Sequence, residues 1–256
     1  SGVLCGTLAR ALGRQGAAVV VVGHSHMEQA QQVAETITSQ GGLAKAVSAD
    51  VLDRRSLEDL ARRTVETFGG VDVLINGAGG AKPEATTSEG VSFFDLPEEA
   101  VRWVFDLNFM GTFLACQVFG RHMVGRDSGA VLNIASAGAD RPLTRSVAYS
   151  AAKAAVVNFT KWLAVHVSQE YSPHIRVNAL MPGFFLTEQN RFLLLDKHSG
   201  ELTERGRRII AHTPMGRFGQ PDDLIGPALL LLSEAAGFMH GTTLTVDGGI
   251  SVYGGV

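Results

Sequence analysis

The sequence lacks the features that mark secreted or membrane-spanning proteins. It contains only two cysteines, Cys5 and Cys116, which lie far apart and form no C-x-x-C motif. We therefore expect buried thiols in a reducing compartment, the cytoplasm, and no disulfide framework. The apolar run at residues 17–23 is too short to cross a bilayer, and we expect neither a signal peptide nor a membrane partner.

The chain also has no large excess of positive or negative charge. The chain has 22 basic and 25 acidic residues, a formal net charge of −3, and no basic run longer than a few residues. This balance argues against a nucleic-acid partner. With 256 residues, 45% of them hydrophobic, the chain is long enough for one large domain with a substantial core.

What is present is an alternation of short apolar runs and longer helical patterns. Strands are expected at residues 18–22, 43–48, 71–75, 130–134, 175–180 and 243–246. Helices are expected at residues 27–40, from Ser56 as a possible cap, and at 97–124, 149–169 and from Pro221. Apolar strands alternating with helices predict an α/β fold, a doubly wound (Rossmann) domain with a parallel sheet and helices on both faces.

We expect this single domain to span residues 1–256, with residues 187–214 forming a helical excursion that covers the substrate. The chain starts in a glycine-containing turn, residues 1–6, that leads into an amphipathic helix. A doubly wound nucleotide fold has a strand before such a turn, so we expect a first strand that the given chain does not include.

Three motifs follow predicted strands directly. Asn76-Gly77-Ala78-Gly79 follows one strand, Ser136 the next, and Pro182-Gly183 another. Because ligands of parallel α/β sheets bind at the carboxyl ends of the strands, these motifs predict a site at that edge.

Tyr149 and Lys153 lie four residues apart on a predicted helix and thus share one face. A free tyrosine has a pKa of about 10, too high for proton transfer near neutrality. A fixed positive charge nearby would lower that pKa. Ser136 adds a hydroxyl that could hold a substrate oxygen beside the phenol.

Together these motifs resemble the short-chain dehydrogenase/reductase family over essentially the whole chain. The resemblance rests on Asn76-Gly77-Ala78-Gly79, Asn108, Ser136, Tyr149-x-x-x-Lys153 and Pro182-Gly183 with Thr187. It implies an NAD(P)-dependent enzyme that interconverts a secondary alcohol and a ketone. By this resemblance, Tyr149 would be the proton donor or acceptor, and Lys153 would lower the pKa of Tyr149 and bind the nicotinamide ribose. Ser136 would orient the substrate, and Asn108 would hold a water.

The same resemblance implies a set of cofactor-binding residues. These are Gly2, Leu4, His24, Ser25, Asp50, Val51, Asn76, Ala78, Gly79, Tyr149, Lys153, Pro182, Gly183, Phe185 and Thr187. The glycine turn departs from the family's usual T-G-x-x-x-G-x-G pattern, since Val3 and Cys5 replace two of its glycines. The tip of the 18–22 strand offers His24-Ser25-His26, with neither an acid nor an arginine, so the choice between NAD and NADP stays open with a slight preference for NAD. No metal site is expected at these histidines.

The segment from Pro182 to Arg191 resembles the sugar-acid branch of the family, which includes D-mannonate oxidoreductases acting on mannonate and fructuronate. A hexonate needs donors for its hydroxyls and a cation for its carboxylate. Candidate substrate residues are Ser136, Gln189, Asn190 and Arg191, and other candidate cations are Arg141, Arg145 and Lys82.

Two other functions remain open. One is reduction of another ketone, such as a 3-oxoacyl or steroid substrate, and the other is a catalytically silent NAD(P)-binding protein. The family resemblance also implies a homotetramer, in which the helix at 97–124 and the Tyr149 helix contact their twins.

Overall fold

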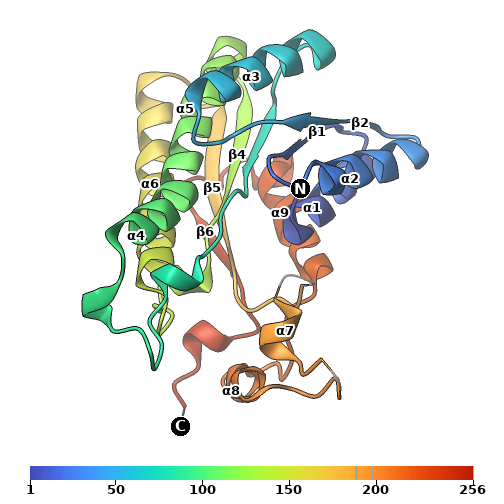
Figure 1. The fold of residues 1–256 in the computed structure, drawn as a ribbon. Coiled ribbons are helices and arrows are strands. Elements are labelled where there is room, and N and C mark those ends of the chain that lie inside the picture. Colours follow the sequence, from blue (N-terminus) through green and yellow to red (C-terminus); the bar gives the residue numbers. More distant parts are fainter. Residues whose placement is uncertain (188–189, 198, 256) are drawn as a thin grey trace.

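The strands of the protein pair in parallel, as their continuous apolar runs predict. The computed structural model describes residues 1–187, 190–197 and 199–255. Its strands are β1 (Ala18–Gly23), β2 (Leu43–Ser48), β3 (Val73–Asn76), β4 (Gly129–Ile134), β5 (Ile175–Pro182) and β6 (Thr243–Val246). Every ladder between these strands is parallel. In Figure 1, β4, β5 and β6 run through the centre of the molecule, and β1 and β2 lie to their right.

These strands form two hydrogen-bonded groups, which corrects the expectation of one continuous sheet. β1 pairs with β2, and β3, β4, β5 and β6 follow one another in a second group. In the described residues no ladder joins β1 to β3; the Val22 carbonyl instead accepts a hydrogen bond from the Ser1 amino group. The strand expected ahead of the first helix is not confirmed, because the first described strand is β1, which follows that helix.

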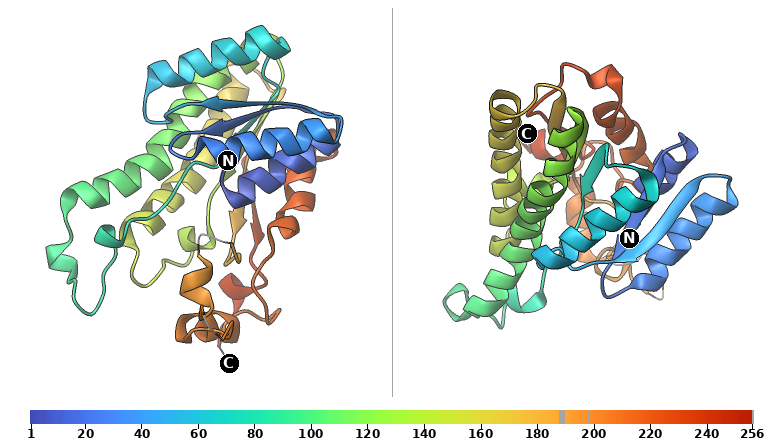
Figure 2. Two further views of the ribbon diagram at one scale, coloured as in Figure 1. Left: turned by 45° about the vertical axis from the view of Figure 1, so that its right-hand side comes forward. Right: turned by 90° about the horizontal axis from the view of Figure 1, so that it is seen from above.

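Helices cover both faces of the strands (Figures 1 and 2). They are α1 (Val3–Arg14), α2 (Met27–Ser39), α3 (Arg54–Phe68), α4 (Glu98–Phe105), α5 (Gly111–Arg126), α6 (Val147–Glu170), α7 (Arg191–Leu194), α8 (Glu204–Ala211) and α9 (Ile225–Leu232). One apolar cluster joins α3, α5 and α6 to β4 and β5, and a second joins α1 and α9 to the opposite face of the same strands. Val131 and Leu132, adjacent in β4, belong to different clusters because side chains alternate along a strand.

The start of α3 differs from the expected cap. Asp53, not Ser56, is its N-cap, and the Asp53 carboxylate accepts a hydrogen bond from the Arg55 amide. The Ser56 hydroxyl instead accepts a hydrogen bond from the Asp50 amide at 3.0 Å. Both residue types are good caps, so composition alone could not decide between them.

A π-helical turn interrupts the long helix expected at 97–124. The turn spans Asp106–Met110 and joins α4 to α5. Asn108, at its centre, is completely buried. Single π-turns of this kind are frequent at functional sites, because they redirect backbone groups that a regular helix would use internally.

The carboxyl ends of the second strand group meet the segment that contains α7 and α8, which lies below the strands in Figure 1. Leu194 of α7 and Ile209 of α8 share a small apolar cluster with Phe218. In the described part of the chain after β5, α7 and α8 therefore pack together against Phe218. That residues 187–214 cover the substrate stays a prediction. Among the described helices none has the length and apolar character needed to cross a membrane.

Candidate active site

A cavity of about 300 Å³ lies at the carboxyl ends of β4 and β5. Both hydroxyl-bearing residues predicted for the chemistry, Ser136 and Tyr149, line it. The other residues of its lining are Ala81, Ala137, Gly138, Leu143, Ser146, Gly183, Phe184, Asn190, Leu194 and Arg205. The fold thus brings together the ends of separate strands, the start of α6 and the segment with α7 and α8.

Ser136 and Tyr149 meet because a short turn follows β4 and α6 begins beside it. Ser136 caps a 3₁₀ turn, and its hydroxyl accepts a hydrogen bond from the Gly138 amide at 3.1 Å. Tyr149 lies in the first turn of α6 and forms a side-chain hydrogen bond with Ser136. Burial raises the pKa of Tyr149, and the hydrogen bond with Ser136 offsets part of that rise.

Lys153 lies one turn further along α6, on the same side as Tyr149. Its Nζ is 5.8 Å from the centroid of the Tyr149 ring and donates a hydrogen bond to the Ile134 carbonyl at 2.8 Å. The side chain is almost fully enclosed, and burial lowers the pKa of Lys153 to about 8.

The expectation that Lys153 lowers the pKa of Tyr149 is wrong for this structure. Removing the phenol from water opposes its ionisation, and this effect dominates. The ammonium is directed to the Ile134 carbonyl. Tyr149 therefore keeps its proton at neutral pH.

Asn108 connects the π-turn to the segment that follows β3. Its Nδ2 donates to the carbonyls of Gly80 and Val104, each at 2.7 Å, and its Oδ1 accepts from the Gly80 amide at 3.3 Å. Gly79 passes between Asn108 and Lys153, because a Cβ at position 79 would lie 2.6 Å from Asn108 Oδ1 and 3.2 Å from Lys153 Nζ. These residues, distant in sequence, form one packed group behind Tyr149.

Asn76 is placed in the interior and not at the surface of the site. Its Nδ2 donates to Asn133 Oδ1 at 2.9 Å and to the Cys116 thiol at 3.2 Å. Asn133 in turn donates to the Thr160 hydroxyl at 2.9 Å. This polar chain crosses β3, β4 and α6, so the Asn76 side chain braces the strands, whereas half-buried Ala78 and exposed Gly79 continue toward the site.

The residues expected to hold the adenosine and pyrophosphate lie at the carboxyl ends of β1 and β2 and at the start of α1. His24 Nε2 is 3.9 Å from the Asp50 carboxylate, an approach that the sequence did not predict. Ser25 is exposed, and Val51 packs against the start of α5 at Gly111. Gly2 is the N-cap of α1 with open space around its Cα, whereas Leu4 joins the apolar cluster under α1 and α9.

The segment after β5 is held by Asn190. Asn190 Nδ2 donates to the Phe185 carbonyl at 2.7 Å, and its Oδ1 accepts from the Thr187 amide at 2.8 Å. Pro182 and the Phe185 side chain are buried. Gly183 lines the cavity and packs closely on Asp247, since a Cβ there would lie 2.6 Å from the Asp247 Cβ.

Of the predicted substrate residues, Ser136 and Asn190 line the cavity, and Gln189 lies outside the described residues. Arg191 is exposed on α7 and is not part of the lining, because it lies at the start of a short helix whose far end, Leu194, turns inward. Sequence reasoning missed Arg205, which is part of the lining. Its position on an amphipathic helix within the predicted excursion was the one signal that could have identified it.

The remaining candidate cations lie elsewhere. Arg141 donates to the carbonyls of Ile250 and Tyr253, at 2.9 and 3.1 Å. The Lys82 ammonium lies over the Trp103 ring, 4.0 Å from its centroid. Arg145 is exposed and does not line the cavity.

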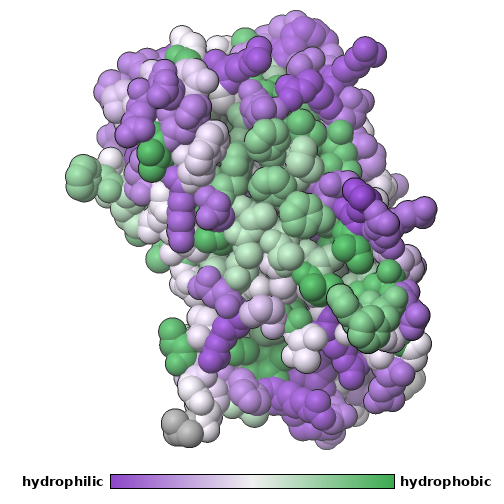
Figure 3. Space-filling model, turned by 90° about the vertical axis from the view of Figure 1, so that its left-hand side faces the viewer, coloured by the Kyte–Doolittle hydropathy of each residue, from purple (hydrophilic) through white to green (hydrophobic). Residues whose placement is uncertain are grey.

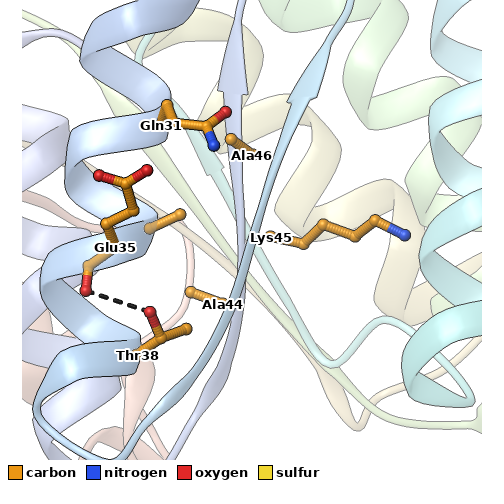
Figure 4. Close-up of a pocket in the computed structure, with 7 residues that line it drawn as sticks. Gln31, Glu35, Thr38, Ala44, Lys45 and Ala46 are labelled. Carbon is orange, nitrogen blue, oxygen red and sulfur yellow. Dashed lines mark hydrogen bonds between the residues drawn. The ribbon is translucent and has the colours of Figure 1, made fainter.

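A second hollow, of about 250 Å³, lies between α2 and β2 (Figure 4). It is lined by Gln31, Ala34, Glu35, Thr38, Ala44, Lys45 and Ala46, none of which belongs to the predicted site. In Figure 4 the Lys45 ammonium points away from Gln31 and Glu35. Of these two cavities in the described part of the chain, the one at Tyr149 contains the hydroxyl groups predicted for the chemistry.

Comparisons with known proteins agree with this geometry. A family model described as enoyl-(acyl carrier protein) reductase matches residues 4–251. The uncharacterised oxidoreductase UxuB of Bacillus subtilis is 49% identical over 265 residues, which cover 100% of this chain and 94% of that protein.

Solved structures are also similar. A crystal structure from Haemophilus influenzae, described provisionally as a D-mannonate oxidoreductase with bound NAD, is 41% identical with a TM-score of 0.92 and covers 100% of this chain and 93% of its own. A gluconate 5-dehydrogenase from Burkholderia cenocepacia, in complex with NADP and tartrate, is 30% identical with a TM-score of 0.83 and covers 97% and 91%. The chain belongs to the short-chain dehydrogenase/reductase family and is an NAD(P)-dependent oxidoreductase.

Proposed function

We propose that the protein interconverts a secondary alcohol and a ketone on a sugar acid such as mannonate or fructuronate. The observation that carries this proposal is that the hydroxyls of Ser136 and Tyr149 lie together on the wall of a small, partly polar cavity. A volume of about 300 Å³ lies at the lower end of the range for small-molecule sites. It suits a six-carbon acid better than a steroid or a long acyl chain.

In this proposal Tyr149 donates its proton to the carbonyl oxygen of the ketone. Its raised pKa keeps the phenol protonated at neutral pH, and Ser136 holds the same substrate oxygen. Lys153, with a pKa of about 8, carries a positive charge over most of the neutral range, and in this proposal it binds the nicotinamide ribose. Both side-chain amide hydrogens of Asn108 are already donated, to the carbonyls of Gly80 and Val104. A water at Asn108 would therefore bind to a carbonyl oxygen of Asn108.

The residues present fit a nicotinamide dinucleotide. Gly79 is exposed and carries no side chain beside Lys153, so a ribose could approach its backbone. The uncapped start of α1 at Gly2 offers amide donors to a pyrophosphate. The cofactor would supply the hydride, and the protein contributes position and a proton.

NAD is the proposed cofactor in preference to NADP. The Asp50 carboxylate lies 3.9 Å from His24, at the edge where a ribose 2′-phosphate would be bound, and it would repel that phosphate. The Haemophilus influenzae relative was solved with bound NAD, which supports the same choice.

The function is tested by measuring cofactor oxidation on a panel of hexuronates, neutral ketoses, 3-oxoacyl esters and steroid ketones, with both NADH and NADPH. We expect the highest kcat/KM with a hexuronate and NADH. Replacing Tyr149 with Phe should lower kcat by about 10²- to 10⁴-fold, the usual contribution of a general acid, while cofactor binding persists. Preference for an acyl or steroid ketone would support the alternative of a different ketone reductase. Cofactor binding without turnover would support a silent binding protein.

We also propose a homotetramer in the cytoplasm. Trp162 and Val165 on α6 are 55% and 58% exposed, and Trp103 on α4 is 37% exposed. Figure 3 shows a hydrophobic area across the face that these helices form. A patch of this kind on a monomer favours contact with another subunit, and a stable monomer in light scattering would contradict the tetramer. The free thiols of Cys5 and Cys116 suit a reducing compartment.

A further inference from the structure

Among the described residues that line the cavity with Ser136 and Tyr149, Arg205 is the one with a charged side chain. It lies in the first turn of α8, after the N-cap Thr203. Leu143, Phe184 and Leu194 make other parts of the lining apolar. Arg205 itself is exposed, and a cation on the partly apolar wall of a cavity favours an anion there.

The guanidinium of Arg205 is also available for a ligand. Among the described residues none forms a hydrogen bond, ion pair or ring contact with it. Its neighbours on α8 differ in this respect: Arg208 is paired with Glu204, and Arg207 donates to the Leu202 carbonyl. Arginine binds carboxylates through two parallel hydrogen bonds, so an unpaired one at a substrate cavity is well suited to a carboxylate.

The backbone that carries Arg205 is held firmly against α7. The Thr203 amide donates to the Leu194 carbonyl at 2.9 Å, and the Gly206 amide donates to the Thr203 hydroxyl at 3.0 Å. A Cβ at Gly206 would lie only 2.3 Å from the Leu194 carbonyl oxygen. Because Leu194 itself lines the cavity, this close packing fixes the distance between the Arg205 backbone and the cavity wall.

We infer that Arg205 binds the carboxylate of the substrate and sets the preference for acids over neutral sugars. This inference rests on the proposed function, since it assumes that the cavity holds a sugar acid, and it replaces Arg191 as the residue responsible. Ser136 and Tyr149 then hold the reacting oxygen, and Arg205, on a separate element, holds the acid group.

The test compares wild type, Arg205→Ala, Arg205→Lys and Arg208→Ala. Arg208 lies on the same helix and outside the lining, so its variant is the matched control for loss of a positive charge. Steady-state kinetics with fructuronate and with fructose, both with NADH, separate acid recognition from chemistry. Calorimetric binding of D-mannonate and D-mannitol in the presence of NAD gives a readout that does not need turnover.

For Arg205→Ala we expect KM for fructuronate to rise by 10- to 100-fold with little change in kcat, and D-mannonate binding to weaken by a similar factor. Values for fructose and D-mannitol should change less than threefold. Arg205→Lys should recover part of the affinity, because it restores the charge and not the bidentate geometry. Arg208→Ala should behave as wild type.

The outcomes separate the two ideas. If wild type reduces fructuronate and Arg205→Ala has the same KM as Arg208→Ala, the carboxylate role is wrong and the proposed function stands. If wild type neither reduces fructuronate nor binds D-mannonate, the proposed function fails and the inference with it. If D-mannonate binds without turnover and Arg205→Ala abolishes binding, the carboxylate site stands although the proposed reaction does not.

Discussion

The Asn108 side chain occupies the space beside Gly79, so that a Cβ at residue 79 would lie 2.6 Å from Asn108 Oδ1. The amide of Asn108 cannot easily turn away, because both of its hydrogens are donated to the carbonyls of Gly80 and Val104. Any side chain at position 79 must therefore displace the π-turn or the Lys153 ammonium, which would lie 3.2 Å from that Cβ. The glycine is therefore needed for packing.

Replacing Gly79 with Ala should lower the free energy of unfolding by about 1–3 kcal/mol, the usual cost of overpacking. It should also reduce kcat, because Asn108 and Lys153 would both shift. Urea denaturation and steady-state kinetics measure the two effects. Gly80→Ala is the matched control, since its Cβ would meet nothing closer than Leu107 Cδ2 at 3.7 Å. Equal effects of the two substitutions would contradict the close-packing argument.

Burial of Lys153 predicts a pH-dependent difference in stability. Its pKa in the folded protein is about 8, whereas the unfolded value is about 10.4. Between those pH values the unfolded chain holds more protons on this residue than the folded chain does. Below pH 8 the buried residue is charged, and the cost to the free energy of unfolding is at its maximum. The cost, at most about 3 kcal/mol, is relieved as the pH rises from about 8 toward 10.4.

Lys153→Met removes this titration. We compare the free energy of unfolding of the variant with that of wild type at each pH. The difference, variant minus wild type, should be about 1–2 kcal/mol larger at pH 7 than at pH 9.5. The measurement is urea unfolding at both pH values, and a difference that is independent of pH would refute the lowered pKa. The lost hydrogen bond to Ile134 reduces the stability of the variant by a similar amount at each pH and so does not affect the comparison.

The contact between Ser136 and Tyr149 predicts that Ser136 influences the pKa of Tyr149. The hydrogen bond between these residues lowers the pKa of Tyr149 against the larger effect of burial. Ser136→Ala should therefore raise that pKa further, and alkaline difference spectroscopy against a Tyr149→Phe background identifies the Tyr149 signal. Turnover should fall by about 10- to 100-fold, within the general acid–base range. An unchanged Tyr149 titration would show that the contact has no electrostatic effect.

The buried chain of Asn76, Asn133 and Thr160 predicts a large stability cost. Asn133 is fully buried, and Asn133→Leu would leave the Asn76 amide without its 2.9 Å acceptor and the Thr160 hydroxyl without its donor. Each unsatisfied buried group costs about 1–3 kcal/mol. We expect a loss of about 2–4 kcal/mol in urea unfolding, whereas Lys45→Ala, on an exposed side chain of β2, should change stability by less than about 0.5 kcal/mol.

Much of the architecture was predictable from local pattern. The apolar runs identified β1 to β6 within a few residues, and the Tyr149 helix was expected at 149–169 and spans Val147–Glu170. The π-turn at Asn108 was not predictable, because its cause is a set of hydrogen bonds to a segment twenty-eight residues earlier in the chain. The grouping of strands was also missed, since the apolar runs of β1 and β3 do not reveal whether their edges will pair.

The sequence by itself determined the family, the parallel strands and the candidate reactive groups, because these depend on periodicity and on residue types at fixed spacing. Only the tertiary structure decided their electrostatics and their partners. It raised the pKa of Tyr149 and lowered that of Lys153, since desolvation depends on how completely the surrounding chain excludes water. It also brought Arg205, and not Arg191, to the cavity, because the folding of α8 onto α7 is a contact between side chains and backbone that no local pattern encodes.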